Sequence, residues 1–190
     1  MPTAWHQDTS YYNVEGSDLI RAWVSPDPVP RGASLEIVRG SHKWNIAYRP
    51  LVGRDSKISK KKHQEVLEKA RRKGFYERAG KEFSYNNSLL DTSLPEIPDI
   101  ENNRGSFDII GWDYEPCDVI LFHGNLIHGA CNETVLTYPR RAHAIMFAGP
   151  DVRYLKRLGQ VIPDPKALAS FKPQTGQYLS DFGDIFPLVS

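Results

Sequence analysis

The sequence predicts a mainly β fold with one or two inserted helices. Short stretches rich in β-branched and aromatic residues recur along the chain and are separated by turns. The 14 glycines and 14 prolines exclude a bundle of long helices. A length of 190 residues is typical of one domain, so we expect residues 1–190 to form a single unit.

The expected strands follow in chain order. Residues 17–24 (SDLIRAWV) mix apolar and polar side chains, and residues 34–38 (SLEIV) resume a strand after a proline-rich turn. Further strands are expected at 107–112 (FDIIGW), 118–122 (DVILF) and 141–148 (RAHAIMFA), the last of them buried.

The segment between the second and third expected strands has a different composition. Lys57–Lys73 holds eight Lys or Arg and two Glu, which predicts a surface helix at about 60–73. Residues 84–106 are expected to form a loop, and the whole of 44–106 is interpreted as an insertion or lid region. Residues 150–190 are expected to form an irregular C-terminal cover.

Composition excludes several classes of partner. The chain has 24 Lys or Arg and 23 Asp or Glu, and this net charge of +1 argues against a nucleic-acid binder. No apolar run approaches the roughly 20 residues that span a bilayer, so no membrane partner is expected. Two cysteines, Cys117 and Cys131, are too few for a disulfide framework, which favours a cytoplasmic location.

The strongest local pattern near the N-terminus is Trp5-His6-Gln7-Asp8. In an extended conformation, residues i and i+2 project to the same face. The His6 imidazole and the Asp8 carboxylate are thereby placed to bind one metal ion. A His and an Asp at a strand end, with no metal role, is the alternative that this short pattern leaves open.

Two more histidines flank the loop after the fourth expected strand. His123 and His128 are five positions apart and do not share a strand face, so at most one should be a ligand. His123 follows an apolar run and is expected to be a core or supporting histidine. His128 precedes Gly129 and Ala130, small residues that let backbone approach a site closely.

His6, Asp8 and His128 together would make a facial triad of two histidines and one carboxylate. Such a triad leaves positions open on Fe(II), and these suit a bidentate 2-oxo acid and O2. Zinc hydrolases also use two histidines and a carboxylate, but a zinc site would give no role to the arginines that follow.

Those arginines lie in Pro139-Arg140-Arg141-Ala142-His143, which is expected to enter the last strand. A guanidinium matches a carboxylate in bidentate geometry, and Arg140 follows His128 closely enough to turn back alongside the same site. Arg140 and Arg141 point to opposite faces of an extended chain, so only one of them can serve it. A surface salt bridge for one or both is the alternative.

Four ordered motifs carry a resemblance to a known family: WHQD, GASLEIVRGSHK, EPCDVILFHGNLIHGACNET and PRRA. Together they resemble the phytanoyl-CoA dioxygenase family of Fe(II)/2-oxoglutarate oxygenases, especially bacterial members with a W-D-x-E-P-G-D block before the distal His. The resemblance covers residues 3 to about 155, apart from the 44–106 insertion.

The resemblance implies a double-stranded β-helix (jelly roll, cupin-like) fold with inserted helices. It implies His6, Asp8 and His128 as iron ligands and catalytic residues, with Fe(II), 2-oxoglutarate and O2 as cofactors. The implied activity is hydroxylation of a C–H bond in a small organic or acyl substrate. Halogenases of this fold carry a small residue in place of the carboxylate, so Asp8 argues against halogenation.

Three further residues are carried over from the family pattern. Arg140 would hold the far carboxylate of 2-oxoglutarate, because the family's arginine is typically followed by one residue and then a small one. Ser34 matches a small polar position near the cosubstrate, and Trp23 matches an aromatic position that lines the site.

The chain departs from the pattern in three places. Cys117 stands where the family usually has Gly in P-G-D, and Arg39 stands where it often has Pro in P-G-S-H. Only five residues precede His6, so the chain is expected to lack the usual N-terminal part with its first barrel strand.

The expected absence of this N-terminal part leads to one prediction and leaves a second interpretation open. One sheet should expose an unpaired edge, which predicts homo-oligomerisation or poor solubility. A second interpretation also stays open, in which the chain is a catalytically impaired cupin-like protein that binds a metal and a ligand without turnover.

Overall fold

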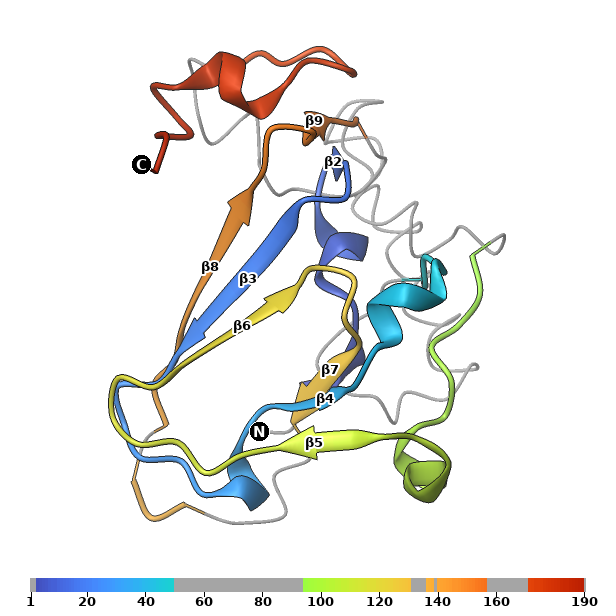
Figure 1. Ribbon diagram of the computed structural model, residues 1–190, viewed down its shortest axis with the longest axis vertical. Coiled ribbons are helices and arrows are strands. Elements are labelled where there is room, and N and C mark those ends of the chain that lie inside the picture. The colour runs from blue at the N-terminus through green and yellow to red at the C-terminus, as the bar shows by residue number, and fades with distance from the viewer. Residues whose placement is uncertain (1–2, 50–93, 131–135, 139, 157–170, 190) are drawn as a thin grey trace, which may run out of the picture.

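The computed structural model describes residues 3–49, 94–130, 136–138, 140–156 and 171–189. Within these ranges the protein is mainly β, which confirms the predicted fold class (Figure 1). The helix expected at 60–73, most of the 44–106 insertion and Cys131 lie outside the described residues. Among the helices in the described part of the chain, none is long and apolar enough to cross a membrane.

Strands alternate with short 3-10 helices along the chain. The strands are β1 (Thr3–His6), β2 (Val14–Glu15), β3 (Leu19–Val24), β4 (Glu36–Val38), β5 (Ile109–Gly111), β6 (Val119–His123), β7 (His128–Ala130), β8 (His143–Ala148) and β9 (Arg153–Tyr154). The 3-10 helices are η1 (Asp8–Tyr11), η2 (Arg31–Ala33), η3 (Ser41–Trp44), η4 (Glu101–Ser106) and η5 (Leu179–Phe182).

Three antiparallel sheets organise these strands. A four-stranded sheet has the order β1-β7-β4-β5, a three-stranded sheet has the order β6-β3-β8, and β2 pairs with β9. Most paired strands are far apart in the sequence, as β1 and β7 are, so the sheets depend on long-range pairing rather than on hairpins. The two larger sheets converge on a shared core, as in a double-stranded β-helix (Figure 1).

The main core fills the space between the two larger sheets. Trp23 and Phe122 enter it from β3 and β6, and Ile37 enters it from β4. The loops between strands supply the other buried members: Val29, Ala33, Leu35, Tyr114 and Leu126. Because side chains alternate across a strand, the strand neighbours of Trp23, Phe122 and Ile37 must face away from this core.

Two smaller clusters complete the interior. One covers the outer face of the four-stranded sheet and consists of Trp5, Val38, Tyr48, Ile100 and Ile127. The other joins the β2–β9 ribbon to the C-terminal segment and consists of Val14, Leu19, Val152, Tyr154, Phe171 and Leu179. The cover expected at 150–190 is therefore partly regular, with β9, η5 and a fully buried Phe171.

Two sequence-based expectations about elements are wrong. The last strand begins at His143 and is exposed along most of its length, because β8 is an edge strand and the outer face of its sheet is bare among the described residues. The end of the expected 84–106 loop is helical, since η4 occupies Glu101–Ser106.

Candidate metal centre

Strand pairing brings the two histidines of the predicted triad together. His6 at the end of β1 lies directly opposite His128 at the start of β7, so both side chains project to one face. Their ring centroids are 4.2 Å apart. Gly129 permits this close pairing, because a Cβ there would lie only 3.0 Å from the carbonyl oxygen of Thr3.

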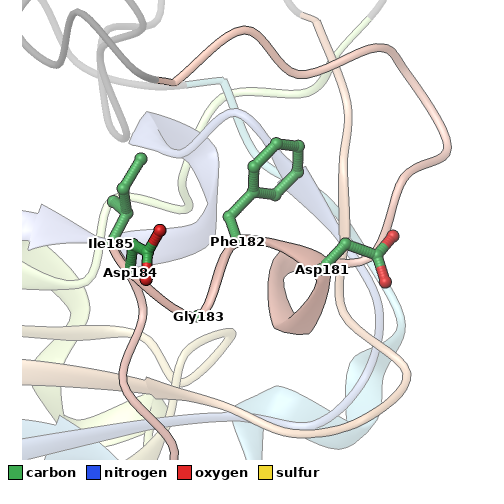
Figure 2. Close-up of a pocket in the computed structure, with 5 residues that line it drawn as sticks. All are labelled: Asp181, Phe182, Gly183, Asp184 and Ile185. Carbon is green, nitrogen blue, oxygen red and sulfur yellow. The ribbon is translucent and has the colours of Figure 1, made fainter.

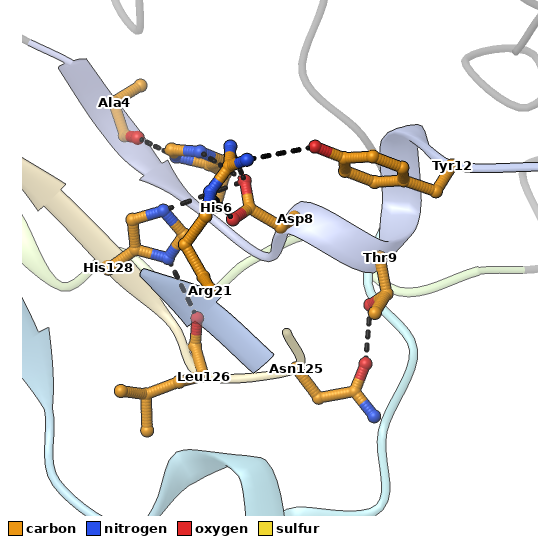
Figure 3. A network of polar contacts seen from close by, with 9 residues as sticks. All are labelled: Ala4, His6, Asp8, Thr9, Tyr12, Arg21, Asn125, Leu126 and His128. Carbon is orange, nitrogen blue, oxygen red and sulfur yellow. Dashed lines mark hydrogen bonds and ion pairs between the residues drawn. The ribbon is translucent and has the colours of Figure 1, made fainter. Parts of the chain in front are cut away.

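Asp8 completes the cluster from a helix rather than from a strand. Gln7 is extended, with φ −109° and ψ 136°, and Asp8 begins η1. The expected convergence of His6 and Asp8 thus depends on the extended Gln7 between them. Oδ1 of Asp8 lies 3.6 Å from Nε2 of His6 and 3.7 Å from Nε2 of His128 (Figure 3).

Backbone carbonyls determine which ring nitrogen of each histidine carries the proton. Nδ1 of His6 lies 2.8 Å from the carbonyl oxygen of Ala4, and Nδ1 of His128 lies 2.9 Å from that of Leu126. A carbonyl oxygen only accepts, so both Nδ1 atoms must donate. In the neutral rings the Nε2 lone pairs are then free and directed toward Asp8.

Burial and charge set the protonation states that a metal ion requires. Burial, together with the neighbouring His6, lowers the pKa of His128 to about 4, so the imidazole is neutral near pH 7. Burial raises the pKa of Asp8, but contacts with the two imidazoles and with Arg21 lower it by more, and the net shift is downward. The site therefore combines a neutral imidazole with an ionised carboxylate.

The three residues fit a divalent transition-metal ion. One ligand atom from each of His6, Asp8 and His128 can be chosen so that all lie within 4.8 Å of one another. Two imidazole nitrogens and one carboxylate oxygen form the donor set of a non-haem Fe(II) centre with open positions. His6, Asp8 and His128 would hold that ion.

A guanidinium that the sequence analysis did not assign contacts the Asp8 carboxylate. Nε of Arg21 lies 2.8 Å from Oδ2 in an ion pair whose angle falls short of a hydrogen bond, and Nη2 donates to Oδ1 at 3.3 Å. Nη1 donates to the Tyr12 hydroxyl at 3.0 Å. The sequence signal for this contact was a single Arg within the apolar run LIRAWV, because a buried cation needs an anionic partner.

Gln7, between the two N-terminal ligands, ties the triad to the loop before β7. Its amide nitrogen donates to the carbonyl oxygens of Ile46 at 3.0 Å and Asn125 at 2.9 Å, and its oxygen accepts from the Tyr48 amide at 3.0 Å. The backbone amide of Asp8 donates to Gly124 in the same loop. Because this loop leads directly into His128, both halves of the triad are fixed to each other.

The remaining predicted site residues gather at another part of the space between the sheets. Arg140 precedes β8, is partly buried and donates through Nη1 to the carbonyl oxygen of Ala33. The buried Ser34 follows directly, and Ala33 belongs to the same cluster as Trp23 and Phe122. The Phe122 ring in turn contacts His128, with centroids 4.8 Å apart.

The two adjacent arginines differ in their partners. Arg141 is exposed and is held by Asp27, whose carboxylate it contacts through Nε and Nη2. Within the described residues, Arg140 pairs with no carboxylate. This difference favours Arg140 as the arginine with free capacity for an anionic ligand.

The other histidine of the pair lies outside the triad. His123 stacks on His42, with ring centroids 5.4 Å apart, and its Nε2 bonds to the carbonyl oxygen of Ser17. His123 is partly buried, and the residues that it contacts here, His42, Ser17 and Asn125, are not triad residues. His143, at the start of the last expected strand, is exposed on β8.

A pocket in the C-terminal segment lies far along the chain from the triad. Five consecutive residues at and after η5 line it: Asp181, Phe182, Gly183, Asp184 and Ile185 (Figure 2). None of them is a predicted site residue, so this pocket is not part of the metal centre.

Comparison with known proteins agrees with this geometry. The model of one family, described as phytanoyl-CoA dioxygenase (PhyH), matches residues 1–142. The chain belongs to the phytanoyl-CoA dioxygenase family. Enzymes of this family use Fe(II), 2-oxoglutarate and O2. A search of functionally curated proteins finds no match.

Solved structures share the fold of this phytanoyl-CoA dioxygenase family member. They include the non-haem α-ketoglutarate-dependent epimerase SnoN and carbocyclase SnoK of nogalamycin biosynthesis, each with 16% identity and a TM-score of 0.52. SnoN in complex with Fe3+, α-ketoglutarate and nogalamycin RO gives a TM-score of 0.56 at 16% identity. Each comparison covers 94% of this chain but only 51%, 53% and 54% of the other, so the chain spans about half the length of these structures.

Proposed function

We propose that this protein is a 2-oxoglutarate-dependent Fe(II) dioxygenase that hydroxylates a C–H bond of a small organic or acyl substrate. The observation that carries the proposal is the convergence of His6, Asp8 and His128, in which each Nδ1 bonds to a backbone carbonyl and both Nε2 atoms face the Asp8 carboxylate. In the overall reaction the substrate C–H becomes C–OH, while 2-oxoglutarate and O2 give succinate and CO2.

The chain's own residues have separate tasks in this proposal. Bound iron would supply the oxidising chemistry, whereas His6, Asp8 and His128 hold it and leave part of its surface open. Arg140 would pair with the far carboxylate of 2-oxoglutarate, and the adjacent Ser34 would line the same end of the cosubstrate. Trp23 and its cluster would exclude water from the space between the sheets.

The test is conversion of 2-oxoglutarate to succinate by the Fe(II)-loaded protein, with and without candidate substrates. Asp8→Ala should abolish turnover, because it removes a ligand. Metal binding without succinate release in any condition would favour the catalytically impaired binding protein instead. If the product is rearranged rather than hydroxylated, the proposed reaction type is wrong but the proposed cosubstrate stands. The structurally similar epimerase SnoN and carbocyclase SnoK are examples of α-ketoglutarate-dependent enzymes with other reaction types.

The arginine assignment has its own matched pair of variants. Arg140→Ala should weaken 2-oxoglutarate binding at least 30-fold, on the order of 2 kcal/mol, and leave the affinity for metal nearly unchanged. Arg141→Ala is the control, because its exposed partner is Asp27. If Arg141→Ala weakens cosubstrate binding and Arg140→Ala does not, the assignment is reversed.

A further inference from the structure

We infer that Arg21 is a positioning residue that sets the orientation of the Asp8 carboxylate toward the metal. The inference rests on the proposed metal centre and assigns a role within it to a residue on the opposite sheet. Arg21 lies on β3, whereas the two imidazoles come from β1 and β7.

The guanidinium of Arg21 lies side-on to the Asp8 carboxylate and contacts both of its oxygens. Nε of Arg21 lies 2.8 Å from Oδ2 of Asp8, and Nη2 lies 3.3 Å from Oδ1. This side-on contact fixes the plane of the carboxylate. In this orientation Oδ1, which accepts the hydrogen bond from Nη2, also faces the two Nε2 atoms, 3.6 Å and 3.7 Å away, whereas Oδ2 lies against Nε (Figure 3).

One consequence concerns how many metal positions Asp8 would take. With Oδ2 against Arg21, Asp8 is oriented to bind through Oδ1 alone. A carboxylate free to rotate could bind through both oxygens and remove a position that a bidentate 2-oxo acid needs. Arg21 therefore preserves the open face of the triad.

Arg21 is itself held in place, as a positioning residue must be. Its Nη1 donates to the Tyr12 hydroxyl at 3.0 Å, and burial raises the pKa of Tyr12, so that the phenol stays neutral and accepts the bond. The side chain of Arg21 is 18% exposed and that of Asp8 is 5% exposed, so water competes little for their contact. Partners of metal ligands with such geometry typically change metal affinity 10- to 100-fold when removed.

The experiment is an anaerobic titration of the full chain with Co(II), followed by the visible absorption of the bound ion. Arg21→Met keeps the aliphatic stem and removes the charge, and it should weaken Co(II) binding about 10- to 100-fold with an altered spectrum. Arg21→Lys should recover part of the affinity and of the spectrum, because an ammonium group can still contact one oxygen. Tyr12→Phe, which removes only the hydroxyl, should weaken binding about 2- to 5-fold, below the loss for Arg21→Met.

The control is Arg39→Met, which removes an exposed ion pair with Asp108 and should leave Co(II) affinity unchanged. An Arg21→Met protein with the wild-type affinity and spectrum overturns the inference, even if its melting temperature is lower. If Arg21→Met does not fold, wild-type spectra in both Arg21→Lys and Tyr12→Phe overturn it. A wild-type protein that takes up no Co(II) would overturn the proposed function as well, which separates the two failures.

Discussion

The two larger sheets both face the common core, but their outer faces differ. The four-stranded sheet is covered outside by the cluster around Trp5 and Ile127. The three-stranded sheet carries a row of exposed apolar side chains on its outer face: Ile20, Val119, Leu121, Ile145 and Phe147. Strand register places all five on one side, because Ile20 pairs with Phe147, and Ala22 pairs with Leu121 and Ile145.

This difference separates two tasks of the fold. The covered sheet carries both histidines of the candidate metal centre, where ligand atoms would have to be held within narrow limits. The bare sheet contributes Arg21 and the apolar wall behind His128. The covered sheet thus holds the two imidazoles, whereas the inner face of the bare sheet contacts Asp8 through Arg21 and its outer face is exposed among the described residues.

The largest expected effect compares one aliphatic residue from each outer face. Ile127 is fully buried directly before β7, and Ile127→Ala should cost about 2–5 kcal/mol of unfolding free energy. Leu121 on β6 is 65% exposed, and Leu121→Ala should change stability by no more than about 0.5 kcal/mol. Denaturant titration of both variants measures the difference, and equal losses would show that the bare face is covered in solution.

The second prediction uses the buried imidazole of the covered sheet. The pKa of His128 is lowered from 6.5 to about 4, so the unfolded chain binds the proton first on acidification. The metal-free protein should therefore lose stability as the pH falls from about 6.5 to about 4, by up to about 3 kcal/mol.

The measurement is the free energy of unfolding at several pH values after the metal is removed with a chelator. His128→Gln should flatten the dependence in this range. His143→Gln, on the exposed β8, is the control and should keep the wild-type slope. A slope that survives His128→Gln would assign the acid sensitivity to another group.

The third prediction concerns self-association through the bare sheet. Homo-oligomerisation stays a prediction, and the exposed apolar face together with the edge strands β6 and β8 gives it a location. Leu121→Lys should reduce concentration-dependent association in sedimentation velocity. Leu188→Lys, at an exposed position of the C-terminal segment, should not change it. A wild-type protein that stays monomeric at high concentration would contradict the prediction.

The smallest effect concerns the turn that leads into the bare sheet. Cys117 has φ +77°, a left-handed conformation that favours glycine, and the family usually has glycine there. Cys117→Gly should stabilise the protein by about 0.5–1 kcal/mol, since relief of backbone strain is partly offset by the entropy of the unfolded glycine. Thermal melting detects a change of this size, and a lower melting temperature would contradict the expectation.

The chemistry of the candidate site could be predicted from the sequence, but its geometry could not. His6, Asp8 and His128 were predicted because ligand types and motif order are local properties of the chain. Their actual arrangement depends on the pairing of β1 with β7, a long-range contact that no local pattern encodes. Asp8 was placed in an extended segment, although it begins a 3-10 helix.

Residues that support the ligands were missed for a related reason. Arg21 lies within an apolar strand. Its ion pair with Asp8 could have been predicted only from knowing which side chains of the two sheets face each other. The exposure of β8 was missed because an apolar run predicts burial without indicating which layer covers it. Apolar composition therefore located the strands, while the tertiary arrangement determined which of them is buried.

The hydrogen bonds of the two imidazoles differ in kind from the contact that supports Asp8. Each Nδ1 bonds to the backbone carbonyl two positions earlier in its own segment, at Ala4 and at Leu126. A substitution at Ala4 or Leu126 leaves the backbone carbonyl in place. The hydrogen bonds that orient the two imidazoles are therefore insensitive to the side chains at these two positions. Asp8 depends on the side chain of Arg21, which a single codon change can remove. The carboxylate side of this centre is therefore the side more sensitive to a single substitution of a supporting residue.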